Sequence, residues 1–156
     1  MAAMTGASKA SETRLIIPAL RSFYDWAAEV SWLIIRLTAG LMLLPHGIPK
    51  VFDQGIAAFA AAGLARRGIE PSLPLAYVIV FNETIGAVML AAGLLTRLVA
   101  ASIAIEMAVI ASLYVPKFGW TGPGYEYVLM WGLITFAIAL RGGGPYSLDR
   151  KLGWEI

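Results

Sequence analysis

Residues 73–115 read LPLAYVIVFNETIGAVMLAAGLLTRLVAASIAIEMAVIASLYV, and this stretch decides the fold. An α-helix needs about 20 predominantly apolar residues to cross the hydrocarbon core of a bilayer. The stretch supplies two runs of about that length, over residues 73–95 and 98–115. Only the tight turn Leu95-Thr96-Arg97 separates them. We therefore predict a hairpin of two transmembrane helices.

Two further apolar runs lie outside this hairpin. One covers about residues 27–47 and the other about residues 125–140, which is short enough that its aromatic and arginine ends are expected in the membrane interface. The composition agrees, because 59% of the residues are hydrophobic and 14% are charged, whereas soluble domains carry about 25% charged residues. The predicted fold is an all-α membrane protein, a bundle of four transmembrane helices.

The chain divides into three parts around these helices. Residues 1–26 are predicted to be a cytoplasmic tail and an amphipathic interfacial segment, with Arg14 and Arg21 towards water and Phe23 and Trp26 towards lipid. Residues 27–141 form the transmembrane domain and residues 142–156 a cytoplasmic tail. Lysine and arginine favour the side of the termini, which holds seven of the 12: Lys9, Arg14, Arg21, Arg97, Arg141, Arg150 and Lys151. The positive-inside rule then places both termini in the cytoplasm.

The sequence excludes several kinds of chemistry. It has no cysteine and one histidine, which rules out disulfides, thiolate-bound iron–sulfur clusters and bis-histidine haem, and no cluster of residues suggests a metal site. The net charge of +2 is too small and dispersed for a nucleic-acid surface. We find no self-contained catalytic constellation, and the catalytic residues, if there are any, stay unassigned. Electrons for a redox role must come from a partner or a diffusible ligand.

Ionisable residues inside the predicted helices are the main functional candidates. Arg36, Glu83 and Glu106 each fall near the middle of a helix, and Asn82 precedes Glu83. Because a buried arginine stays protonated, we expect an Arg36–Glu83 ion pair. The pair either locks two helices together or lines a polar pocket for a lipophilic ligand such as a quinone or a lipid.

The direction in which Glu106 points is open at this stage. The third helix carries small residues at every fourth position, namely Ala100, Ala104, Ala108 and Ser112, and such a stripe lets helices approach closely. If the stripe faces the bundle, Glu106 faces lipid or another chain. If the stripe faces a partner, Glu106 joins the Arg36 cluster, and we favour this second arrangement slightly.

The outer mouth of the pocket is predicted from the ends of two helices. Lys50 falls on the same helix face as Arg36, and His46 lies nearby. Glu126 begins the fourth helix at this level, where it could pair with Lys50 or His46. His46 is either a residue of the helix end or a ligand-binding, proton-handling group.

These residues also carry a resemblance to the DoxX family of small four-helix membrane proteins. The matching pattern consists of Arg36 with Gly40, His46-Gly47 with Lys50, Glu83 with Gly86, Gly93-Leu94-Leu95-Thr96-Arg97, Glu126, and Gly144-Pro145-Tyr146-Ser147-Leu148-Asp149. Their order and spacing span about residues 33–152. The sequence departs from the pattern at Glu106, where the family is apolar, at Pro45 and Pro49, and in its N-terminal segment.

The resemblance implies a multi-pass protein of a bacterial-type inner membrane. One founding context of the family is a membrane subunit linked to a thiosulfate:quinone oxidoreductase. The leading hypothesis is therefore a subunit of a quinone-linked redox complex, with a quinone as the non-covalent ligand and a membrane protein or a second copy as partner. One alternative is a purely structural or assembly subunit. The other is a transporter for a small solute or protons.

Overall fold

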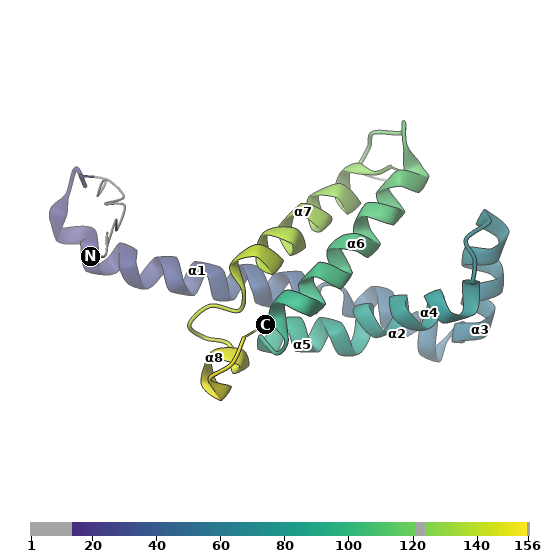
Figure 1. Cartoon of the computed structure of the whole chain (residues 1–156). Coiled ribbons are helices and arrows are strands. Elements are labelled where there is room, and N and C mark those ends of the chain that lie inside the picture. The colour runs from purple at the N-terminus through teal and green to yellow at the C-terminus, as the bar shows by residue number, and fades with distance from the viewer. Residues whose placement is uncertain (1–13, 121–123, 156) are drawn as a thin grey trace, which may run out of the picture.

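The computed structural model describes residues 14–120 and 124–155, and all of its regular elements are helical (Figure 1). Residues 1–13, which make up half of the predicted N-terminal segment, lie outside the described residues. The longer α-helices are α1 (Arg21–Leu41), α2 (Leu44–Phe52), α4 (Ser72–Phe81), α5 (Ala87–Ala92), α6 (Thr96–Tyr114) and α7 (Glu126–Arg141). The short ones are α3 (Ile56–Phe59) and α8 (Leu148–Leu152), with π-helical segments at Ala60–Leu64 and Asn82–Gly86 and 3-10 turns at Pro18–Leu20 and Ala65–Arg67.

Three helical stretches in the described part are long and apolar enough to cross a membrane: Pro18–Phe52, Ser72–Ala92 and Thr96–Tyr114. The predicted hairpin corresponds to the last two. The predicted fourth span corresponds to α7, whose 16 residues reach about 24 Å at 1.5 Å per residue. That is shorter than a hydrocarbon core of about 30 Å, so a count of four spans stays a prediction.

The first helix differs from its prediction at both ends. It begins at Arg21 and runs through Trp26 without a break, so the described residues Arg21 to Trp26 belong to α1 itself. It then ends at Leu41, six residues before the predicted Gly47, and α2 carries the chain on to Phe52. Pro45 explains the break, because proline donates no backbone N–H and its ring crowds the carbonyl of residue i−4, here Leu41.

The helices pack in two antiparallel pairs that share one core. α6 lies along α7, and α1 packs on α5 (Figure 1). α1 comes so close to α5 at Gly40 that a Cβ there would lie 2.5 Å from the carbonyl oxygen of Ala87. The core consists of Trp32, Ala39, Leu43, Ala87, Leu90, Val99, Ala100, Ile103, Met107, Trp131 and Ile138. Outward-facing side chains such as Ile105, 66% exposed, and Leu133, 60% exposed, suit contact with acyl chains, so the bilayer is the environment in which this surface is stable.

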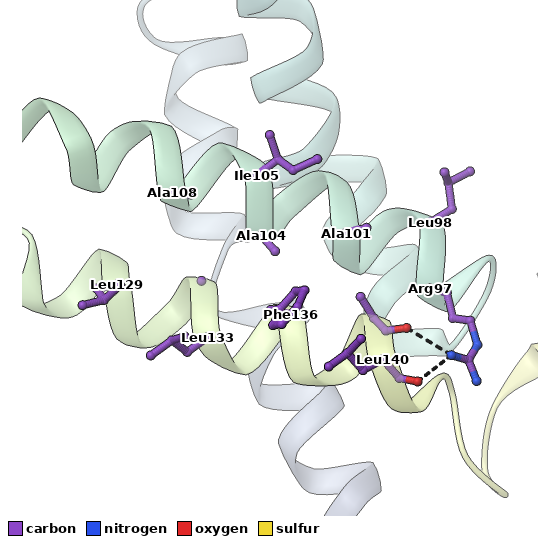
Figure 2. Close-up of a pocket in the computed structure, with 12 residues that line it drawn as sticks. Arg97, Leu98, Ala101, Ala104, Ile105, Ala108, Leu129, Leu133, Phe136 and Leu140 are labelled. Carbon is purple, nitrogen blue, oxygen red and sulfur yellow. Dashed lines mark hydrogen bonds between the residues drawn. The ribbon is translucent and has the colours of Figure 1, made fainter.

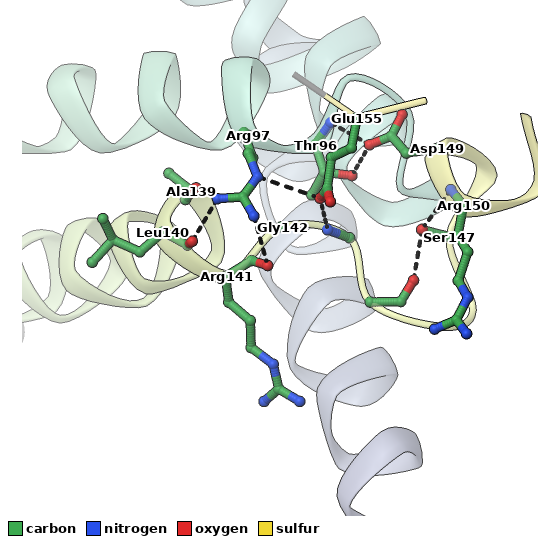
Figure 3. A network of polar contacts seen from close by, with 12 residues as sticks. Thr96, Arg97, Ala139, Leu140, Arg141, Gly142, Ser147, Asp149, Arg150 and Glu155 are labelled. Atoms are coloured by element: carbon green, nitrogen blue, oxygen red, sulfur yellow. Dashed lines mark hydrogen bonds and ion pairs between the residues drawn. The ribbon is translucent and has the colours of Figure 1, made fainter. Parts of the chain in front are cut away.

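The turn between α5 and α6 is held by charged groups from distant segments. Arg36 on α1 donates from Nη1 to the carbonyl oxygens of Leu90 (3.1 Å) and Ala91 (2.6 Å), and from Nη2 to that of Tyr146 (2.6 Å). Asp149 accepts from the backbone N–H groups of Leu95 (2.7 Å) and Thr96 (2.8 Å) (Figure 3). The last carbonyls and first N–H groups of a helix have no partner within it, so the arginine and the aspartate complete the two helix ends.

A second arginine closes the end of α7. Arg97 donates to the carbonyl oxygens of Leu140 and Arg141 and forms an ion pair with Glu155 at 3.5 Å (Figure 3). Trp32 Nε1 donates to the carbonyl oxygen of Gly142 at 3.0 Å. The C-terminal segment therefore joins three helices at one end of the bundle.

Replacing Arg36 should destabilise the protein strongly. Arg36→Met leaves three carbonyl oxygens without their donor, and hydrogen bonds to a charged group contribute about 1.5–3 kcal/mol each, so we expect a loss of at least about 3 kcal/mol in the free energy of unfolding. Arg21→Met removes an exposed arginine from the same helix and should cost less than about 0.5 kcal/mol. Equal losses for the two variants in detergent unfolding would show that the Arg36 contacts do not hold the turn.

Candidate functional site

The centre of the bundle contains an ion pair between Lys50 on α2 and Glu83 in the π-helical segment. The Lys50 ammonium donates to Glu83 Oε2, and the two side chains are 20% and 4% exposed. Gly47 makes this possible: a Cβ there would lie 2.5 Å from the carbonyl oxygen of Glu83. Because Lys50 is three residues after Gly47, both lie on the same face of α2. Because Gly47 has no side chain, α2 can approach Glu83 closely enough for the Lys50 ammonium group to reach the carboxylate.

A second buried contact lies beside this pair. Asn82 Nδ2 donates to Glu106 Oε2 on α6 at 2.8 Å, and Ser102 Oγ donates to Asn82 Oδ1 at 2.9 Å. Asn82 and Glu106 are both buried. Consecutive residues of a helix point about 100° apart, so Glu83 faces α2 while Asn82 faces α6. We call Lys50, Asn82, Glu83, Ser102 and Glu106 the central polar cluster.

The backbone that carries this cluster is irregular. Asn82–Gly86 is π-helical within an otherwise α-helical stretch. Single-turn π-helical segments are rare and are often found at functional sites. The position of this one, at two buried polar side chains, marks the centre of the helix as the candidate site.

A cavity of about 320 Å³ opens on the Lys50–Glu83 side of the cluster. We call it the aromatic cavity; its lining residues are Leu43, His46, Lys50, Glu83, Met107, Ile110, Tyr114, Trp120, Gly124, Tyr127, Val128 and Trp131. The rings of Trp120 and Tyr127 meet edge to face at 5.5 Å, and those of Tyr127 and Trp131 lie 5.6 Å apart. Trp131 Nε1 is buried and has no hydrogen-bond partner among the described residues. The cavity therefore combines aromatic walls, an ammonium group and an unused N–H donor.

Two other hollows are more apolar. One, of about 210 Å³, lies between α4 and α6 and has Asn82, Ser102 and Glu106 at its polar end. The other is a groove of about 710 Å³ between α6 and α7, and alanines of α6 and the side chains of Leu133 and Phe136 on α7 are among its lining residues (Figure 2). Arg97 stands at one end of the groove, but its guanidinium already binds the end of α7. The groove offers no free polar group for recognition.

The structure corrects two predicted pairings. The Arg36–Glu83 ion pair is wrong: Arg36 binds backbone carbonyls at the α5 end, and Glu83 binds Lys50. The prediction placed Arg36 at mid-membrane by counting about nine residues from a helix start near residue 27. The structure places Arg36 at the end of α5, and Lys50 on α2 reaches Glu83 instead. Glu126 pairs with neither Lys50 nor His46 among the described residues, and it does not line the aromatic cavity.

The other predicted site residues lie in the aromatic cavity or in the central polar cluster. His46, Lys50 and Glu83 line the aromatic cavity, and Asn82 connects Glu83 to Glu106 through the central polar cluster. Glu106 faces inward, as the favoured arrangement required, but it meets Asn82 instead of Arg36. The sequence prediction missed Trp131 and Tyr127, whose spacing of four residues on one helix face was the available signal. Within the described residues, no group of three or more histidine, aspartate or glutamate side chains could hold a metal ion.

The apolar helices and buried charges define the class: a multi-pass α-helical membrane protein. Residues 31–116 match the model of the DoxX family, so the chain belongs to the DoxX family. It is 30% identical over 126 residues to the protein named "Putative oxidoreductase CatD" of Bacillus subtilis (strain 168), which covers 78% of this chain and 86% of that protein. No solved structure matches the chain.

Gly47→Ala tests the close approach that positions Lys50. The added methyl group would meet the backbone of Glu83, and overpacking of this kind costs about 1–3 kcal/mol. Gly63→Ala is the matched control, because the atoms nearest its Cβ belong to the ring of Phe59 and not to a backbone. Unfolding in detergent should show the loss for Gly47→Ala and a clearly smaller change for Gly63→Ala; no loss at Gly47 would contradict the packing described.

Proposed function

We propose that the protein is an inner-membrane subunit of a quinone-linked redox complex and that it binds the head of a quinone in the aromatic cavity. The observation that carries this proposal is Trp131 Nε1, a buried donor that has no partner within residues 14–120 and 124–155, in a cavity that Lys50 also lines. A carbonyl oxygen of the ligand would accept from this N–H. The name of the Bacillus subtilis relative supports an oxidoreductase context.

The size and walls of the cavity fit a flat ring. Its volume of about 320 Å³ is at the lower end of the range of about 300–1,000 Å³ for small-molecule sites. Tyr127 and Trp131 offer ring faces and edges for stacking. A bound quinone would supply two-electron redox chemistry; this chain supplies hydrogen-bond donors, aromatic contacts and a site shielded from water. The electrons would come from a partner protein.

Trp131→Phe tests the proposed contact while keeping an aromatic ring. The chain would be purified in nanodiscs and titrated with a short-chain ubiquinone analogue by calorimetry. Loss of one hydrogen bond, about 1.4 kcal/mol, should weaken binding about tenfold. Trp154→Phe, on an exposed tryptophan in the C-terminal segment, should bind like the unchanged protein. Equal affinities for Trp131→Phe and the unchanged protein would exclude the cavity as the site.

The same titration separates the quinone proposal from its alternatives. Phospholipid in the purified protein, with no binding of the analogue, would favour a lipid ligand. No ligand of either kind would favour a purely structural or assembly subunit. No specific contact in the structure favours the transporter hypothesis over these.

We also propose that both termini lie in the cytoplasm, which requires α7 to cross the membrane as a fourth span. A green fluorescent protein fused after residue 156 should then fluoresce, because it matures only on the cytoplasmic side. Alkaline phosphatase inserted after Lys117 should be active, because it needs the outer side. The opposite result at either position would contradict the proposed topology.

A further inference from the structure

Glu106 is a buried carboxyl group with only part of its hydrogen-bonding capacity used in the described part of the chain. Its side chain is 8% exposed, and Oε2 accepts one hydrogen bond from Asn82. Its other oxygen, Oε1, is buried and has no hydrogen-bond partner in the part of the chain that the structure describes. Burying an oxygen without a hydrogen-bond partner costs free energy, because the oxygen loses its hydration.

The missing partner is not a positive side chain. The cation within reach, Lys50, already pairs with Glu83. Arg36 is bound to backbone carbonyls at the α5 end. With Lys50, Glu83 and Glu106 all ionised, the cluster would carry one net negative charge in an apolar surrounding, which costs several kcal/mol in proteins and membranes.

Another carboxyl group belongs to the same buried cluster. Glu83 directly follows Asn82, which binds Glu106, and both glutamates are buried. Two carboxylates cannot hydrogen-bond to each other, whereas a carboxylic acid and a carboxylate can. Around Glu106, Asn82 comes from the π-helical segment and Ser102 from one turn earlier on α6, and Lys50 from α2 joins the cluster through Glu83. A single proton between the two carboxyl groups would satisfy Oε1 and make the whole cluster neutral.

We propose that Glu106 is a proton-binding site and that it exchanges its proton with Glu83 at the edge of the aromatic cavity. In the transfer, the O–H bond at Glu106 breaks and an O–H bond forms at Glu83. The negative charge moves from Glu83 to Glu106, where the amide N–H of Asn82 holds it. The step needs no oxidant or reductant.

The transfer has a consequence for the cavity. Once Glu83 is neutral, the ammonium group of Lys50 no longer faces a carboxylate beside it and is free to donate to a ligand oxygen. Because Glu106 also lies at the polar end of the cavity between α4 and α6, the proton site stands between two cavities. The proton on Glu106 is proposed independently of any ligand. Only the release of Lys50 towards a ligand in the aromatic cavity rests on the proposed function.

Infrared spectroscopy of the full chain in nanodiscs tests the proton directly. A protonated carboxylic acid has a C=O stretch that is separate from the carboxylate bands and shifts to lower frequency in D₂O. Without added quinone at neutral pH, we expect one such band from a buried group, lost in Glu106→Gln. Glu29→Gln, on an exposed glutamate of α1, should leave the band unchanged.

A second variant tests the exchange with Glu83. In Glu83→Gln, Lys50 loses its counterion, so Glu106 should release its proton and the acid band should disappear although Glu106 is present. Absence of the band from the unchanged protein overturns the proposal, even if no variant folds. A band that persists in Glu106→Gln or in Glu83→Gln also overturns it. Since no quinone is added, a failure here is distinct from a failure of quinone binding.

Discussion

The Lys50–Glu83 ion pair is the interaction on which the centre of the structure depends. It requires α2 to touch the π-helical segment at Gly47, backbone against backbone. Lys50 and Glu83 both line the aromatic cavity. The ion pair also engages Lys50, which leaves Glu106 to be completed by an amide and, in our proposal, by a proton. One close approach at a glycine thus determines the chemistry of three ionisable groups.

The buried charges of this protein perform two separate tasks. Arg36, Arg97 and Asp149 lie at one end of the bundle and bind backbone groups that helix ends leave open. Lys50, Glu83 and Glu106 lie at its centre and bind mainly one another and Asn82. The motifs that carry the family resemblance divide in the same way: the arginine, the turn and the C-terminal motif build the fold, whereas Lys50 and Glu83 face a cavity.

Much of this architecture could be predicted from hydropathy, because an apolar run of sufficient length has few other stable forms. The hairpin of the second and third apolar runs was predictable in this way. The placement of His46 near Lys50 followed from the period of the helix. The partner of Arg36 was not, because it depends on a helix break at Met42–Leu43 and on carbonyl groups that carry no sequence signal. Trp131 was overlooked because aromatic residues near a helix end are also typical of the membrane interface.

The central claim is that Lys50 and Glu83 hold each other inside the membrane. A double-mutant cycle of Lys50→Met and Glu83→Gln, measured as the free energy of unfolding in a bilayer-mimicking detergent, tests it most directly. Each single variant leaves one buried charge without its partner, at a cost of about 3 kcal/mol or more. We predict that the double variant loses less than the sum of the two, with a coupling energy of about 2 kcal/mol. Additive losses would contradict the account.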